Sequence, residues 1–219
     1  MNLLIINPNI SAATNARIRA IAGALIKAPD EVEVVSAPSG IELIETVEQS
    51  VATVPAVLSV VKERHEMADA IIIAAFSDPG LAEARKAASC PVFGIAEAAM
   101  KMAAGVAERF VIITLGGDLG EAIQTNAETY GVAENLTEVR ILPWTVTEVS
   151  ADPPAYEKAF AEACQQAVSE GGVGAVIIGG GPLSGIADAI ADDLPIPVLD
   201  GVRCAVTLIQ KLWRERRIL

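Results

Sequence analysis

The sequence predicts an α/β protein with two related lobes, each a parallel four-stranded sheet flanked by helices, with a cleft between them. Short apolar runs of strand length alternate with helical patterns along the chain, which is typical of βαβ units. Residues 70–80 also recur in outline as residues 175–185, and both stretches are apolar strands that end in small residues. Such self-similarity favours an internal duplication.

The repeat continues on both sides of these strands. Residues 4–7 open the first half as residues 111–114 open the second, and each strand ends in a small polar residue. Downstream, residues 90–97 correspond to residues 196–203 at nearly the same offset. We therefore expect two equivalent halves.

The boundaries of the lobes follow from the repeat. Lobe 1 is expected to comprise residues 1–104 and about 200–219, and lobe 2 residues 105–199. Because no linker rich in Gly, Pro or Ser separates the halves, we expect the lobes to pack closely.

Eight strands are predicted. They lie near residues 2–7, 32–36, 70–75, 91–95, 109–114, 138–142, 175–179 and 197–199, with helices between them. A helix near residues 13–26 follows Ser11 and Thr14, which can cap it, and one near 155–170 follows an Asp-Pro-Pro start signal. An amphipathic helix over about 48–66 is expected to pack on a sheet, and its surface is also a candidate for assembly.

Composition excludes several classes of protein. The net charge of −12 argues against a nucleic-acid partner, and no apolar run approaches the roughly 20 residues that cross a bilayer. No targeting segment is recognisable at the N-terminus, which favours a cytoplasmic location. A single histidine, His65, in a highly charged helical end makes a metal site or a Ser-His-Asp triad improbable.

Functional residues are expected where strands end, because open parallel sheets bind ligands at the carboxyl ends of their strands. Glycines there let a carbonyl or carboxylate approach the backbone, and Gly179–Gly181 lacks the Lys and Ser/Thr of a phosphate loop. The predicted substrate-binding residues are Asn7, Asn9, Ser11, Ala75, Phe76, Ser77, Thr114, Gly180, Gly181, Ser184 and Arg203.

Several of these segments, in this order, resemble the Asp/Glu/hydantoin racemase superfamily, most closely its hydantoin and allantoin racemase branch. They are Ile6-Asn7-Pro8-Asn9-Ile10-Ser11, Gly40-Ile41-Glu42, Val54-Pro55-Ala56-Val57-Leu58, Phe76-Ser77-Asp78-Pro79-Gly80-Leu81, Pro91-Val92-Phe93-Gly94-Ile95-Ala96-Glu97-Ala98-Ala99 and Pro197-Val198-Leu199-Asp200-Gly201-Val202. The resemblance runs from end to end. It implies a cleft enzyme that needs no cofactor and that assembles into dimers or larger homo-oligomers.

The resemblance also implies a pair of cysteines, one from each lobe, on opposite faces of the substrate stereocentre. One thiolate removes the Cα proton and the other thiol returns a proton. This chain departs from that pattern, because Ala75 and Gly180 stand at the two cysteine positions. Its own cysteines, Cys90, Cys164 and Cys204, are expected to be small buried hydrophobes.

Three carboxylates are candidate catalytic groups in place of the thiols. Asp78 could act as an acid or base, or could cap the helix that follows it. Glu97 could pair with Arg203 at the equivalent point of the other half, or Arg203 could clamp a substrate carboxylate, or both residues could simply lie in the first turns of their helices. Asp200 could orient a water or bind a ring N–H, or could cap a helix. With both thiols absent we also expect an enlarged cleft.

Three functions remain open at this point. The first is hydrolysis or elimination on a small carboxylate, amide or cyclic ureide. The second is racemisation or isomerisation of a hydantoin-like or amino-acid-like substrate by carboxylate bases. The third is binding of a small anion without catalysis, which would not require carboxylates that point into the cleft.

Overall fold

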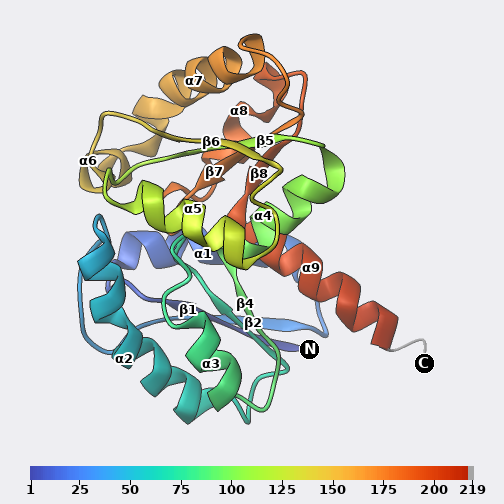
Figure 1. The fold of residues 1–219 in the computed structure, drawn as a ribbon. Helices are drawn as coiled ribbons and strands as arrows, with labels where there is room; N and C mark the ends of the chain where they lie inside the picture. The colour runs from blue at the N-terminus through green and yellow to red at the C-terminus, as the bar shows by residue number, and fades with distance from the viewer. Residues whose placement is uncertain (217–219) are drawn as a thin grey trace.

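Two separate parallel sheets of four strands lie one above the other, with helices packed on their faces (Figure 1). The structure is a computed structural model that describes residues 1–216, so the last three residues assigned to lobe 1 lie outside it. The strand orders are β2-β1-β3-β4 and β6-β5-β7-β8. Each strand of the first sheet therefore has a counterpart four strands later, and the predicted fold class is confirmed.

The elements follow one another as the repeat predicts. The strands are β1 (Asn2–Asn7), β2 (Glu31–Ser36), β3 (Ala70–Ile73), β4 (Val92–Gly94), β5 (Phe110–Thr114), β6 (Leu136–Ile141), β7 (Ala175–Gly179) and β8 (Val198–Asp200). The α-helices are α1 (Ala12–Leu25), α2 (Val47–Arg64), α3 (Leu81–Ala87), α4 (Ile95–Val106), α5 (Leu119–Thr129), α6 (Val146–Ala151), α7 (Glu157–Ser169), α8 (Ile186–Ile190) and α9 (Gly201–Arg216). Three short 3-10 turns are η1 (Pro153–Tyr156), η2 (Gly181–Leu183) and η3 (Ala191–Asp193).

Two helix starts differ from the prediction. The helix expected near residues 155–170 begins only at Glu157, after the 3-10 turn η1, which opens with two consecutive prolines. Ser11 alone caps α1: its hydroxyl accepts the Thr14 N–H at 3.3 Å, so Thr14 lies inside the helix.

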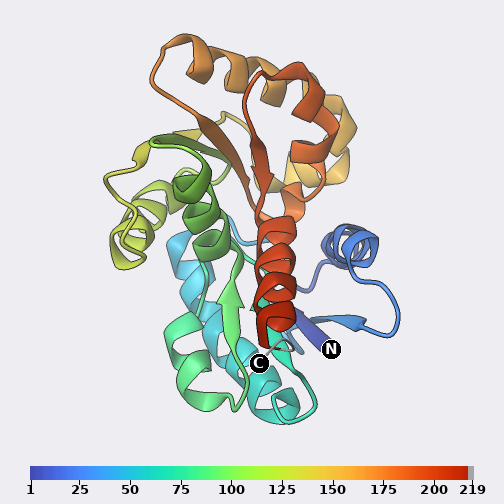
Figure 2. The ribbon, with the colours of Figure 1, turned by 90° about the vertical axis from the view of Figure 1, so that its right-hand side faces the viewer.

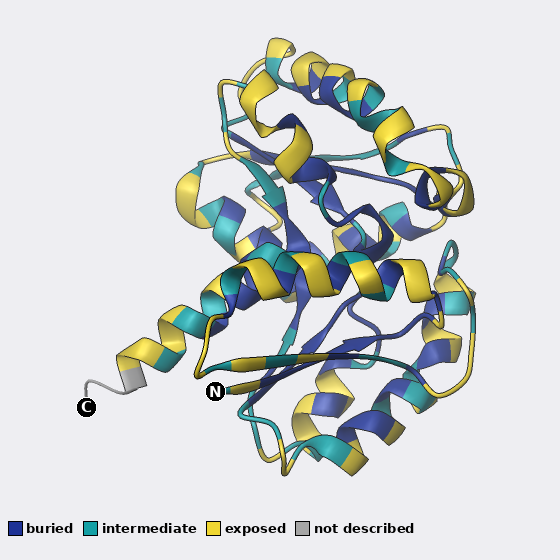
Figure 3. Cartoon of the chain, turned by 180° about the vertical axis from the view of Figure 1, so that it is seen from behind, coloured by how far each residue is buried: buried dark blue, intermediate teal, exposed yellow. Residues whose placement is uncertain are grey.

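The central strands are apolar throughout because helices cover them on both sides. Every residue of β3, β5 and β7 is buried, and exposed residues gather on the outer faces of the helices (Figure 3). Helices α4 and α9 pack on each other, and both contact strands of the second sheet (Figure 2). One core cluster consequently includes Ile72 of the first sheet and Ile112 of the second, which holds the two sheets in close contact.

Candidate functional site

The carboxyl ends of β3 and β7 meet directly. A Cβ atom built on Gly179 would lie 2.7 Å from the Phe76 ring, and one on Gly181 would lie 2.6 Å from the carbonyl oxygen of Ala74. No side chain fits at either position without displacing its neighbour. The two glycines therefore allow the strand ends of the two lobes to approach each other.

A small cavity of about 40 Å³ remains beside this contact. It is lined by Asn9, Ile44, Ala75, Phe76, Ser77, Thr114, Leu115, Leu119, Ile123, Val146, Gly179, Gly180, Gly181, Pro182 and Leu183. Residues of both lobes contribute, as expected for a cleft at the strand ends. Because small-molecule pockets usually measure roughly 300 Å³ or more, this cavity is closed around a space for only a few waters.

Seven of the predicted substrate-binding residues line the cavity. They are Asn9, Ala75, Phe76, Ser77, Thr114, Gly180 and Gly181. The other four, Asn7, Ser11, Ser184 and Arg203, do not belong to its wall. The lining residues that sequence reasoning missed are mainly apolar side chains in loops or at helix starts, such as Ile44, Leu119 and Val146, and no local motif distinguishes these from core residues.

Asn7 does not line the cavity, but its side chain hydrogen-bonds to the backbone of Asn9, which does. The Asn7 side-chain oxygen accepts the backbone N–H of Asn9 at 3.0 Å, and its amide nitrogen donates to Asn15. Asn9 is only 1% exposed, and its side-chain oxygen finds no hydrogen-bond partner among the described residues. A buried acceptor without a partner is costly, so this atom is available to an N–H group of a bound molecule.

Asp78 is turned away from the cavity. Its carboxylate accepts the backbone N–H groups of Ala96 at 3.1 Å and Glu97 at 2.8 Å, and the Tyr130 hydroxyl donates to it at 2.7 Å. Asp78 thus caps α4 rather than the helix directly after it, whose N-cap is Gly80. Burial raises the pKa of the Asp78 carboxyl to about 6, although the three hydrogen bonds oppose that rise.

Glu97 and Arg203 do not pair with each other. Glu97 accepts hydrogen bonds from Arg85 and from Lys101, the latter at 2.7 Å, whereas Arg203 pairs with Asp188. Burial raises the pKa of Glu97, but Arg85 and Lys101 outweigh that effect and leave it below its usual value. Both side chains are therefore engaged by other partners.

Asp200 caps α9. Its carboxylate accepts the backbone N–H of Arg203 at 2.9 Å and that of Gly185 at 3.2 Å, and burial raises its pKa. All three candidate catalytic carboxylates accordingly accept hydrogen bonds from their surroundings, and none lines the cavity. Among the described residues of the cavity wall there is no acid, base or thiol.

The cysteines are inert hydrophobes. Cys164 and Cys204 are buried, and burial raises the pKa of each thiol to about 12. Cys90 is partly buried, and burial raises its pKa as well. None of the three belongs to the cavity wall. No thiolate is therefore available at the strand ends near neutral pH.

The space beside Gly180 is partly filled by a neighbouring side chain. Gly180 adopts φ +141°, a conformation that L-residues rarely take, and a Cβ there would lie 3.2 Å from Cγ of Leu183. The Leu183 side chain thus stands against the position where the second thiol was expected. The backbone of this loop has adapted to glycine.

Two sets of hydrogen bonds connect the lobes beside the cavity. Glu45, beside Ile44, accepts the backbone N–H of Thr147 at 3.0 Å and its hydroxyl at 2.8 Å. Arg17 of α1 donates to the Ser150 hydroxyl at 3.0 Å and to the Pro182 carbonyl at 3.3 Å. Helix α6, which carries Val146 and Ser150, is thereby tied to lobe 1.

Weakening the Glu45–Thr147 contact should expose α6 to solvent without unfolding the protein. We expect Glu45→Gln to raise the rate of amide hydrogen exchange in residues 145–151 several-fold, because a neutral amide oxygen accepts these hydrogen bonds more weakly than a carboxylate does, by roughly 1 kcal/mol in total. Exchange measured by mass spectrometry tests this. Glu42→Gln is the matched control in the same loop, and equal exchange in both variants would contradict the assignment.

The raised pKa of Asp78 predicts a pH dependence of stability. A carboxyl with a native pKa near 6 and an ordinary pKa when unfolded binds its proton more tightly in the native state. The part of its stabilisation that depends on this bound proton is complete below about pH 4 and is lost as the pH rises through about 6, on the order of 3 kcal/mol. Urea unfolding of wild type and Asp78→Asn at pH 4 and pH 7 should show a smaller pH effect in the variant; equal effects would contradict the prediction.

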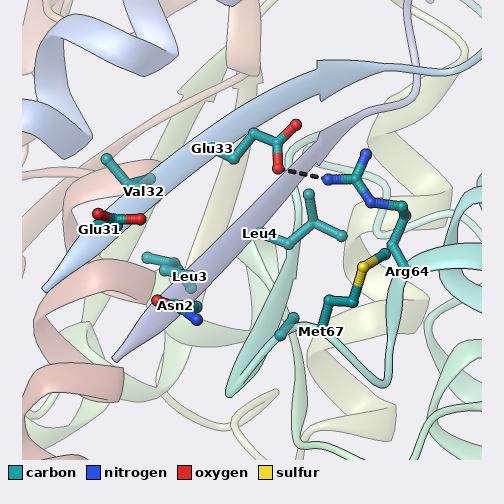
Figure 4. A pocket seen from close by; sticks show the side chains of 9 residues that line it. Asn2, Leu3, Leu4, Glu31, Val32, Glu33, Arg64 and Met67 are labelled. Atoms are coloured by element: carbon teal, nitrogen blue, oxygen red, sulfur yellow. Dashed lines mark hydrogen bonds and ion pairs between the residues drawn. The ribbon is translucent and has the colours of Figure 1, made fainter.

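Another hollow, of about 300 Å³, lies away from the strand-end cavity. Figure 4 shows it between β2 and the end of α2, with the Arg64–Glu33 ion pair across it. It is lined partly by Asn2, Leu3 and Glu31, which begin their strands. It therefore lies near the amino ends of β1 and β2, opposite the edge where ligands of parallel sheets bind.

Other kinds of site are not evident in the part of the chain that the structure describes. No helix in residues 1–216 is long and apolar enough to span a membrane. No group of three or more His, Cys, Asp or Glu side chains among these residues could hold a metal ion. His65 lies at the end of α2, where its ring hydrogen-bonds to Ser89.

Comparisons with known proteins agree with this architecture. A family model described as Asp/Glu/Hydantoin racemase matches residues 3–209. The hydantoin racemase of Pseudomonas sp. (strain NS671) is 28% identical over 213 residues, which are 97% of this chain and 86% of that protein. The structure of allantoin racemase from Klebsiella pneumoniae is 32% identical and superposes with a TM-score of 0.93, over 98% of this chain and 88% of the other.

A more distant structure shares the fold alone. The maleate isomerase Iso from Pseudomonas putida S16 is 15% identical, with a TM-score of 0.74 over 98% of this chain and 93% of the other. The resemblance stated from the sequence, including its hydantoin and allantoin racemase branch, is confirmed by the nearer relatives. The chain belongs to the Asp/Glu/hydantoin racemase family.

Proposed function

We propose that this chain is an enzyme that binds a hydantoin-like or allantoin-like cyclic ureide in the interlobe cavity, which widens to admit the ring, and that it acts on the ureide without a pair of thiols. The observation that carries the proposal is the composition of the cavity wall. Ala75 and Gly180 both belong to it, and none of its described residues is an acid, a base or a thiol. Transfer of a proton from one face of a stereocentre to the other requires two such groups.

A neutral ring suits this wall better than an anion. No Lys, Arg or His is among the described lining residues, and Arg203, the expected clamp for a carboxylate, pairs with Asp188 instead. The unpartnered oxygen of Asn9 can accept a ring N–H. The relatives named hydantoin racemase and allantoin racemase support the same substrate class.

Hydrolysis or elimination is the reaction that we propose. In hydrolysis, water adds across a ring C–N bond, so that the hydroxyl goes to the carbonyl carbon and the proton to the departing nitrogen. No described residue of the wall can serve as the acid or base, so this role falls to Asp78, the residue after Ser77, whose pKa of about 6 is near neutrality and which would have to leave its hydrogen bonds with α4 and Tyr130 to reach the water. Racemisation by carboxylate bases has less support, since it needs carboxylates on both sides of the ring.

Binding without turnover is the second candidate. It is favoured by one specific observation: Asp78, Glu97 and Asp200 are all held by hydrogen bonds outside the cavity wall. A receptor has no need of acid or base groups that point at its ligand. Under this alternative the bound molecule is still a neutral ureide rather than the small anion first considered.

Calorimetric titration with hydantoin, allantoin, N-methylated hydantoins and small carboxylates tests the proposal, followed by proton NMR of each mixture. We expect the ureides to bind, the N-methylated rings to bind more weakly, and the carboxylates not to bind. New product resonances would support hydrolysis or elimination, and binding without products would support the receptor. Preferential binding of the carboxylates, or no binding of any ureide, would refute the substrate class.

A further inference from the structure

Helix α2 has one face in the core of lobe 1 and one face in solvent. Thr53, Val57 and Val60 are buried on the inner face, and the helix lies at the outer flank of the lobe (Figure 1). Exposed residues follow one another along α2 at spacings of four and three, which places them on one side of the helix. They are Glu48, Ala52, Pro55, Ser59 and Lys62, and we call this side the outer face of α2.

The outer face of α2 carries charge only at its two ends. Residues 49–61 contain no Asp, Glu, Lys or Arg. Val51 borders this face and is 63% exposed, and Val47, one turn earlier, is 40% exposed. The solvent side of a surface helix usually carries charged and polar residues. An uncharged stretch with exposed valines therefore indicates a contact with another protein.

The charges at the two ends fit a second copy of the same chain. Glu48 lies in the first turn of α2 and Lys62 in its last turn, seven residues before and seven residues after Pro55. If two copies of α2 pack antiparallel with their Pro55 residues opposite each other, Glu48 of each copy faces Lys62 of the other. A parallel pair would instead bring like charges together. The outer face is thus self-complementary in the antiparallel arrangement, as a twofold interface requires.

Pro55 adds a backbone acceptor to the same face. Proline has no N–H, so the Val51 carbonyl lacks the donor that an α-helix would supply four residues later. In the antiparallel pair Val51 lies opposite Ser59 of the second copy, because these residues stand four positions before and after Pro55. The exposed Ser59 hydroxyl can donate to this carbonyl. The small side chains of Ala52 and Ser59 also let the two helix backbones approach each other.

We propose that the chain forms a homodimer through the outer face of α2, with two copies of this helix packed antiparallel about a twofold axis at Pro55. Val51 of each copy is covered by the other helix, and two Glu48–Lys62 ion pairs close the ends of the contact. No residue of α2 lines the interlobe cavity, so the dimer leaves the cavity wall as described. Because a contact through one helix of each copy is small beside the roughly 1,600 Å² of a standard interface, the dimer should dissociate at micromolar concentrations.

Sedimentation velocity of the full chain tests this interface. We expect wild type to pass from monomer to dimer between about 1 and 100 µM. Val51→Lys should abolish the dimer in this range, because it places a charge in the apolar part of the contact on both copies. Since Val51 is exposed in the monomer, this variant should keep the circular dichroism spectrum and the melting temperature of monomeric wild type.

Charge reversal tests the pairing of the helix ends. Glu48→Lys and Lys62→Glu should each weaken the dimer about tenfold, because each variant sets like charges against one another at both ends of the contact. The double variant Glu48→Lys/Lys62→Glu should restore the affinity of wild type. Lys158→Glu, at an exposed position of α7, is the matched control and should leave the dimer unchanged.

Cross-linking tests the register of the two helices. Pro55→Cys should form an intermolecular disulfide under a mild oxidant, whereas Ser59→Cys should not, because the two Ser59 positions lie about 12 Å apart along the paired helices. Wild type that stays monomeric throughout the concentration range would overturn the proposal. So would a dimer that survives both Val51→Lys and Glu48→Lys, or cross-linking of Ser59→Cys in preference to Pro55→Cys.

Discussion

Asp78→Ala is expected to lower the free energy of unfolding by about 3 kcal/mol, because three buried donors lose their acceptor at once. These donors are the backbone N–H groups of Ala96 and Glu97 and the hydroxyl of Tyr130. The change also removes the cap of α4, the helix that contacts both sheets. Urea unfolding followed by circular dichroism at pH 7 measures the effect.

Tyr130→Phe is the control for this prediction. It removes a single donor to Asp78 and leaves the cap of α4 in place, so a loss of about 1 kcal/mol is expected. If Asp78→Ala costs no more than Tyr130→Phe, the carboxylate does not organise this region. A role in catalysis would then become the better explanation for its burial.

Gly180→Cys is expected to destabilise the protein by about 2 to 3 kcal/mol and to confer no racemase activity. The reason is the backbone: φ is +141° at this position, and the new Cβ would lie 3.2 Å from Cγ of Leu183. Ala75→Cys adds only a thiol at a wall position with no such conflict, so we expect it to cost less than 1 kcal/mol. Thermal unfolding compares the two variants.

Gly180→Ala separates the effect of the added Cβ atom from the effect of the thiol on the stability of the Gly180→Cys variant. Alanine brings the Cβ but no thiol, and it should account for most of the destabilisation of Gly180→Cys. A Gly180→Cys variant as stable as wild type, or an Ala75→Cys/Gly180→Cys double variant that racemises hydantoins, would show that the loop still accepts the two-thiol arrangement.

The strands could be predicted because their signals are local. Runs such as Ala70–Ile73 and Ala175–Gly179 are apolar over strand length, and their repetition gave the pairing of the two halves. Capping of α9 by Asp200 could also be predicted, as one of two possible roles for this residue. The Asp200 carboxylate and the Arg203 N–H that it accepts lie only three residues apart in the sequence. Lining of the cavity by Ala75 and Gly180 was expected from the family motif.

The partners of the other polar groups could not be predicted, because they come from distant parts of the chain. Asp78 caps a helix that begins 17 residues later and binds Tyr130 of the other lobe, whereas sequence proximity suggested the helix beside it. Glu97 pairs with Arg85 instead of its symmetry counterpart Arg203. The closed cavity depends on Leu183 and on the Glu45–Thr147 contact, and neither carries a recognisable sequence signal.

The central claim is that this cavity binds a cyclic ureide but carries no pair of bases for proton transfer at its stereocentre. Proton NMR in deuterium oxide tests it most directly, with a single enantiomer of C5-isobutylhydantoin at a concentration that saturates the protein. We predict that the C5 proton is lost no faster than in a protein-free sample, and that the ligand keeps its handedness. Loss of that proton accelerated by the protein, with conversion to the other enantiomer, would contradict the claim.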